Sequence, residues 1–199
     1  MNTLHHRCRA CVASALVACA LVACTPARYI ETGGPESIVS VGDVDIQDVK
    51  KAASGMLQSL LATGVLAKSE HKPARLLIGS IVNDTSSQFD VGEVVYRMRE
   101  ELVNSGQAQV DTTYGSSAED KTAQEVAKRR SFTGSGSSDL GEPDFSLTGR
   151  ITQMKASADN MKQTTYTFRL TLTDLATGRE VWTKTVDMTK QGTKNAVGM

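Results

Sequence analysis

The side chains that could do chemistry are few once the first 23 residues are set aside. His71 is then the only histidine and Cys24 the only cysteine. A Ser–His–Asp triad, a Cys–His dyad and a multi-histidine metal site each lack the residues they need. The carboxylates Asp43, Asp45 and Asp48 could supply paired acid–base groups, although helix capping and solvation explain them more simply. We therefore expect no enzyme, no metal site, no cofactor and no small-molecule substrate.

Length and charge exclude further classes of protein. The chain has 199 residues, of which 40% are apolar, and this suits one globular domain. From Cys24 onward 20 basic residues face 22 acidic ones, because only Arg7 and Arg9 precede it. A formal charge of −2 argues against a general electrostatic binder of nucleic acid. We expect His71, between Glu70 and Lys72, to lie in an exposed loop.

The N-terminus has the pattern of a lipoprotein signal peptide. Two arginines precede an uncharged, mostly apolar run over residues 10–23, which is shorter than the ~20 residues that a spanning helix needs. The run ends Leu21-Val22-Ala23-Cys24, which resembles a bacterial lipobox, so we expect lipidation at Cys24. Cys19 is an overlapping alternative, and an ordinary cleaved signal or a poor anchor is another. Thr25, in place of aspartate, favours the outer membrane.

Hydrophobic spacing predicts the elements of one domain. Helices are expected from Asp45 to Gly64, from Asp90 to Asn104 and from Ser116 to Arg130, and strands at about 76–82, 108–112, 145–156, 164–174 and 180–189. This order predicts an α/β (α+β) fold: a single mixed β-sheet with helices packed mainly on one face and a C-terminal three-stranded antiparallel meander. We expect a signal peptide over 1–23, a lipidated cysteine and short tether over 24–44, the domain over 45–190 and a disordered tail over 191–199.

Several side chains can be assigned to the core from these patterns. Tyr166, Phe168, Leu170 and Leu172 alternate with polar residues, which predicts that they share the buried face of a strand. Trp182 is expected to be buried on the neighbouring strand. In the third helix we expect three small or apolar residues to face inward: Ala123, Val126 and Ala127.

Several segments, taken in order, resemble the LpoB family. They are the lipobox, Val82-Asn83-Asp84-Thr85, Asn104-Ser105-Gly106, Phe145 to Ile151 and Tyr166 to Trp182. The resemblance covers about residues 45–190. It implies an outer-membrane lipoprotein whose domain is like the N-terminal domain of TolB and docks on a class A penicillin-binding protein. Docking would raise the glycosyltransferase and transpeptidase activities of that bifunctional peptidoglycan synthase, so no active site is needed.

The resemblance transfers no docking residue, so the docking surface is inferred from the residues alone. A Gly/Ser-rich loop follows the third helix, and binding residues concentrate on mobile loops beside a rigid sheet. The candidate residues for partner binding are Lys128, Arg129, Arg130, Asp139, Leu140, Glu142 and Pro143. The alternatives are a solvated connector for the loop and helix-dipole electrostatics for the three basic residues.

Two other functions stay open. The tether is short and contains only Pro26 and Pro35, whereas well-known members of the family have a long, proline-rich tether. This favours the alternative of a structural or assembly lipoprotein of an envelope, secretion or surface-organelle system. A hydrolase that uses carboxylates is a residual possibility.

Overall fold

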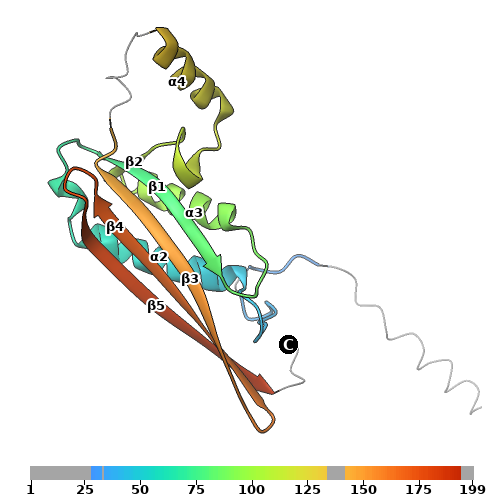
Figure 1. Ribbon diagram of the computed structural model, residues 1–199. Coiled ribbons are helices and arrows are strands. Elements are labelled where there is room, and N and C mark those ends of the chain that lie inside the picture. The colour runs from blue at the N-terminus through green and yellow to red at the C-terminus, as the bar shows by residue number, and fades with distance from the viewer. Residues whose placement is uncertain (1–27, 33, 134–141, 194–199) are drawn as a thin grey trace, which may run out of the picture. The chain divides into compact units, whose positions relative to one another are not determined.

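All the helices and strands that the structure describes lie in the part of the chain from residue 37 onward. The computed structural model describes residues 28–32, 34–133 and 142–193. Figure 1 labels the elements, which in chain order are α2 (Ile46–Ala62), the 3-10 turn η2 (Leu66–Lys68), β1 (Ala74–Asp84), α3 (Val91–Asn104), β2 (Ala108–Val110), the 3-10 turn η3 (Gly115–Ser117), α4 (Lys121–Thr133), β3 (Phe145–Ala158), β4 (Met161–Asp174) and β5 (Arg179–Thr193).

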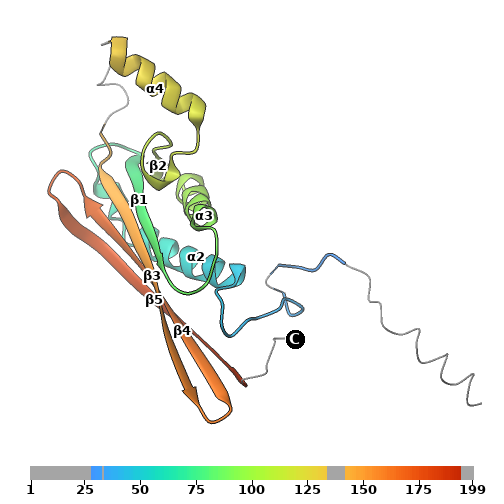
Figure 2. The same ribbon diagram turned by 45° about the vertical axis from the view of Figure 1, so that its right-hand side comes forward.

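The five described strands form one mixed sheet in the order β2-β1-β3-β4-β5. β1 pairs in parallel with β2 and β3, whereas β3, β4 and β5 pair antiparallel. Figures 1 and 2 show α2 and α3 side by side on one face of the sheet. The predicted α+β fold, with its mixed sheet and C-terminal meander, is confirmed.

The core lies between this face and the two helices. Tyr166, Phe168, Leu170 and Leu172 are all buried, which confirms the predicted facing of β4. Trp182 is opposite Leu172 in the sheet and is 9% exposed, so it too belongs to the core. The helices contribute Val49, Met56, Leu57 and Leu60 from α2 and Val94, Val95, Met98 and Leu102 from α3.

The ends of α2 follow the sequence signals. The backbone N–H of Asp45 donates to Asp48 Oδ2 at 2.8 Å, and this bond forms part of a capping box. After the helix, Gly64 has a φ of +66°, a left-handed conformation that glycine adopts without steric cost. The predicted start and stop of this helix are therefore confirmed.

The third helix differs from its prediction. Gly115–Ser117 is a 3-10 turn, and α4 begins only at Lys121, where Asp120 Oδ1 accepts a hydrogen bond from the backbone of Ala123 at 3.0 Å. None of the side chains of α4 that the structure describes is buried. The expectation that its apolar residues face the core is wrong, because α4 does not pack on the sheet and its three apolar positions only edge a surface cavity.

The chain ahead of α2 is bound to the fold by side chains from distant elements. We call residues 40–45 the strap. The backbone N–H of Val44 donates to Ser87 Oγ at 3.1 Å, and Lys190 Nζ donates to the carbonyl of Asp43 at 2.9 Å. At the other terminus, β5 continues to Thr193, three residues past the expected domain end at residue 190.

Candidate functional site

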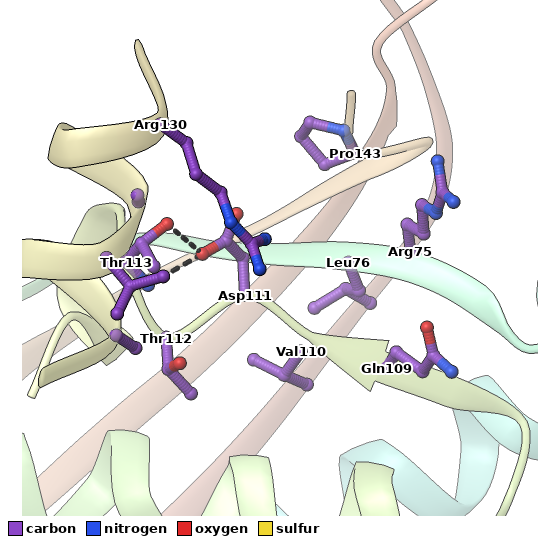
Figure 3. Close-up of a pocket in the computed structure, with 12 residues that line it drawn as sticks. Arg75, Leu76, Gln109, Val110, Asp111, Thr112, Thr113, Arg130 and Pro143 are labelled. Atoms are coloured by element: carbon purple, nitrogen blue, oxygen red, sulfur yellow. Dashed lines mark hydrogen bonds between the residues drawn. The ribbon is translucent and has the colours of Figure 1, made fainter. Parts of the chain in front are cut away.

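A surface cavity of about 340 Å³ opens between α4, β2 and the start of β1 (Figure 3). Four separate segments line it. They are the first residues of β1 (Arg75, Leu76), β2 with the turn after it (Gln109 to Thr113), one side of α4 (Ala123, Val126, Ala127, Arg130) and Pro143 before β3. We call it the α4 cavity.

Asp111 shapes the turn that directs the chain from β2 toward α4. Its backbone N–H donates to the carbonyl of Leu76 at 2.9 Å, which extends the parallel pairing by one residue. Its Oδ1 accepts from the backbone N–H and the hydroxyl of Thr113, at 2.6 and 2.7 Å. A short polar side chain that satisfies the next backbone groups in this way is a typical turn former.

Gly115 carries the chain past the edge of β1 after that turn. Its φ is +68°, and a Cβ at this position would lie 2.3 Å from the carbonyl oxygen of Ile78. No other residue type fits so close to the β1 backbone. This close approach holds the turn ahead of α4 against β1.

The cavity has an apolar floor and a charged rim. Leu76 is 1% exposed and Val126 is 44% exposed, so the apolar surface runs from the core to solvent. Arg75 and Arg130 stand on the rim, and Figure 3 shows Arg130 extending from α4 toward Asp111. An apolar floor under planar guanidinium groups suits an apolar side chain of a partner with a carboxylate beside it.

The described lining of the cavity contains few titratable groups. Among these residues Asp111 is the only carboxylate, and none is a histidine, cysteine or lysine. Paired acid–base chemistry needs a second titratable group within reach. The arginines and the apolar side chains among the described lining residues are groups suited to contacts with a partner.

The structure brings together only part of the predicted docking surface. Arg130 and Pro143 line the α4 cavity, whereas Lys128 and Arg129 are exposed on α4 and do not line it. Glu142 is exposed next to Pro143. Asp139 and Leu140, like the lipidation candidates Cys24 and Cys19, lie outside the described residues. Sequence reasoning missed Arg75 and Asp111, although the Asp-Thr-Thr turn signal of Asp111 was present.

His71 is half-buried and bonded, unlike the exposed loop histidine expected. Its Nδ1 is 2.8 Å from Asp144 Oδ1, while Asp144 Oδ2 accepts from Ser69 Oγ at 2.5 Å and from the backbone N–H of Arg75 at 2.8 Å. Burial raises the pKa of Asp144, but these hydrogen bonds outweigh it and leave the pKa below its usual value. Because Ser69 bonds to the carboxylate and not to the imidazole, the cluster is not a catalytic triad.

The carboxylates ahead of and within α2 are held by a lysine from β5. Lys190 Nζ lies 2.6 Å from Asp45 Oδ2 and 2.5 Å from Asp48 Oδ2, and Asp48 is only 8% exposed. Burial lowers the pKa of Lys190, but its bonds to both carboxylates outweigh this and raise it. Capping is confirmed for these residues, whereas solvation is not the explanation of Asp48. The carboxylates of Asp45 and Asp48 therefore have a structural role, because both are bonded to the ammonium group of Lys190.

Within the described residues, no group of three or more histidine, cysteine, aspartate and glutamate side chains is placed to hold a metal ion. No helix in that part of the chain is long and apolar enough to cross a membrane.

Comparisons with known proteins place the chain in a family. The model of the peptidoglycan-synthase activator LpoB matches residues 48–188. Among solved structures, the LpoB C-terminal domain from Salmonella enterica is 16% identical over 71% of this chain and 98% of that one, with a TM-score of 0.44. The Escherichia coli domain has the same coverage and TM-score at 15% identity. Lipoprotein GNA1162 from Neisseria meningitidis is 16% identical over 60% and 84%, with a TM-score of 0.35.

No curated protein sequence matches the chain. The family match, however, begins inside α2, ends inside β5 and includes every element between them. The chain therefore belongs to the LpoB family of peptidoglycan-synthase activators.

Proposed function

We propose that this protein is an envelope lipoprotein that binds a class A penicillin-binding protein and raises its peptidoglycan-synthesising activity. The observation that carries the proposal is the family match over residues 48–188, which spans the sheet and its helices. The family is one of activators, and the α4 cavity has the character of a binding site. We therefore assign the protein a regulatory role and no catalytic reaction.

We assign synthase docking to the α4 cavity and the residues beside it. Arg75 and Arg130 would meet a carboxylate of the synthase, while Val126 and Pro143 would cover an apolar side chain. The neighbouring candidates are Lys128, Arg129, Asp139, Leu140 and Glu142. Docking activates the enzyme only as far as the protein binds the active conformation more tightly than the inactive one.

Docking at this cavity is tested by matched substitutions on two helices. Val126 in α4 and Val103 in α3 are 44% and 47% exposed, so an aspartate costs a similar amount of stability at either site. Val126→Asp should reduce synthase binding at least tenfold, whereas Val103→Asp should leave it unchanged. Equal binding by both variants would remove the α4 cavity from the docking surface.

We propose outer-membrane anchoring through acyl chains on Cys24, with Cys19 as the alternative. Several acyl chains, at ~0.8 kcal/mol per buried methylene, make such an anchor effectively permanent. Cys24→Ser should abolish acyl labelling and release the protein from membranes. Labelling that persists in Cys24→Ser and disappears in Cys19→Ser would move the site to Cys19.

The second candidate is an assembly lipoprotein of an envelope, secretion or surface-organelle system. The length of the tether favours it, because the strap is bound to the fold and the sixteen residues from Cys24 to Ser40 span at most ~58 Å when fully extended. In-cell crosslinking of the tagged full-length protein, followed by mass spectrometry, separates the two candidates. A class A penicillin-binding protein among the captured proteins supports the activator, whereas secretion or assembly components alone would support the second candidate.

A further inference from the structure

A second cavity, of about 400 Å³, lies at the other end of β3 from the α4 cavity. β3 starts at Phe145, next to Pro143, and ends at Ala158 in the hairpin with β4. The second cavity lies between this hairpin, the end of β5 and the strap residues Ser40 to Gly42. We call it the hairpin cavity.

The hairpin cavity is basic. Lys155 and Lys162 line it from the two arms of the hairpin, and none of the described residues that line it is acidic. Lys155 Nζ donates to Ser86 Oγ at 2.8 Å, a neutral acceptor that leaves its charge uncompensated. The ammonium group of Lys162 makes no ion pair or hydrogen bond with another residue that the structure describes. The described residues that line the cavity therefore contribute two positive charges and no negative one.

Hydroxyl groups accompany these charges. Ser157 and Thr164 line the cavity on the same face of the hairpin, since Ser157 pairs with Lys162 and Thr164 pairs with Lys155 across the two strands. Ammonium groups next to hydroxyl donors form a surface that recognises phosphate or carboxylate oxygens. Of three nearby carboxylates, Lys190 occupies those of Asp45 and Asp48, whereas that of Asp43 accepts hydrogen bonds from the hydroxyls of Ser40 at 3.3 Å and Ser87 at 3.4 Å.

The strap places this cavity where the tether joins the fold. Ser40 follows Cys24 by sixteen residues, a length of chain that reaches at most ~58 Å. Lys190 holds the strap at Asp43 and Asp45, so the chain arrives beside the hairpin cavity. With Cys24 lipidated, the phosphate groups of the anchoring membrane are the anions that the cavity meets at the highest local concentration.

We propose that the hairpin cavity binds the phosphate of an anionic phospholipid headgroup and so orients the domain on its own membrane. The inference rests on the proposed lipid anchor. Two lysines near a membrane surface give on the order of a 30-fold preference for anionic over neutral lipid. A preference of this size gives weak membrane binding for a free protein, but it is sufficient to orient a protein that is already tethered to the membrane. Because the α4 cavity is at the opposite end of β3, it stays available to the synthase.

The experiment uses the chain from Thr25 to Met199 without lipid, so that binding reports the cavity and not the anchor. Sedimentation with vesicles of phosphatidylglycerol and phosphatidylcholine should retain the protein, and pure phosphatidylcholine vesicles should not. Lys155→Gln with Lys162→Gln should lower binding to the anionic vesicles at least tenfold. The matched control, Lys68→Gln with Lys184→Gln, removes two exposed lysines elsewhere and should bind like the natural sequence.

Four results would overturn the inference. They are equal binding to neutral and anionic vesicles, an equal loss in the control pair, binding of inorganic phosphate that depends on Lys155 and Lys162 while vesicle binding does not, or binding to purified peptidoglycan sacculi that depends on these lysines while vesicle binding does not. The third would indicate a site for free phosphate and the fourth a site for wall peptides. Circular dichroism and urea melts establish that each variant is folded.

The two proposals fail in distinguishable ways. The lysine pair lies far from the α4 cavity, so its substitution should leave stimulation of a detergent-solubilised synthase unchanged. Vesicle binding without any stimulation would contradict the activator role alone. Stimulation without lysine-dependent vesicle binding would contradict the headgroup site alone.

Discussion

Lys190, three residues before the end of β5, bonds to Asp45, the residue that caps α2, at 2.6 Å across 145 positions of sequence. Asp48 shares the same ammonium group, and Lys190 Nζ lies 5.8 Å from the centre of the Tyr166 ring. This one side chain joins the strap, the first turn of α2 and the last strand. The strap is therefore part of the folded domain, although residues 40–44 lie in the stretch expected to be a tether.

Replacing Lys190 should destabilise the domain strongly. In Lys190→Gln two largely buried carboxylates lose their cation, and breaking such a pair costs about 3 kcal/mol. Lys184 lies on the same strand and is exposed, so Lys184→Gln should cost less than ~0.5 kcal/mol. Urea melts at pH 7 measure both. Similar midpoints for the two variants would mean that Lys190 contributes no more than a surface charge.

The ion pairs of Lys190 also predict that the stability of the domain falls at alkaline pH. The folded-state pKa of Lys190 is raised above its ordinary value, so its contribution to the free energy of unfolding is complete below the unfolded pKa of about 10.4. That contribution is lost as the pH rises through the folded pKa. The stability gap between the natural sequence and Lys190→Gln should therefore narrow above pH 10, and a gap that widens there would contradict the assignment.

Asp144 should show the opposite pH dependence. Its folded pKa lies below the ordinary value, so its contribution is present above about pH 4 and is lost as the pH falls through the folded pKa. Asp144→Asn should cost about 2 kcal/mol at pH 7 and progressively less below pH 4. Asp159→Asn, in the exposed β3–β4 turn, is the control and should be near neutral. A constant loss from pH 7 to pH 2 would show that the charge of Asp144 plays no part.

Two glycines with the same backbone conformation should differ sharply on substitution. Gly115 and Gly178 have φ values of +68° and +66°, but only at Gly115 would a Cβ meet other atoms. Gly178→Ala should cost about 1 kcal/mol from left-handed strain alone. Gly115→Ala adds the clash with Ile78 and should cost about 2 kcal/mol more. Equal losses in thermal melts would place the turn farther from β1 than the structure has it.

The local spacing of apolar residues correctly predicted the helices and strands whose buried side chains repeat regularly along one face. The strict alternation around Phe168 and the helical spacing from Val49 to Leu60 are each compatible with one orientation of the element. Only the face that carries the apolar side chains can pack on the core. α4 shows the limit of such reasoning. Its spacing of Ala123, Val126 and Ala127 predicts a helix, but the same stripe fits an exposed cavity wall as well as a core.

The site depends on contacts that no local pattern encodes. The α4 cavity combines side chains from Arg75 to Pro143 that meet only after the sheet has formed. The bond between His71 and Asp144 crosses 73 positions, and that between Asp45 and Lys190 crosses 145. The scarcity of histidine and cysteine argued against catalysis by these residues from the sequence alone, whereas the partners of each charged side chain required the register of the strands.

The activator role is tested most directly by glycan polymerisation. The chain from Thr25 to Met199, without lipid, is added to each purified class A penicillin-binding protein of the source organism, and the rate of lipid-linked precursor consumption is measured. We expect stimulation of at least one synthase, reduced in Val126→Asp and kept in Val103→Asp. Unchanged rates for every synthase, with protein that is folded by circular dichroism, would contradict the account.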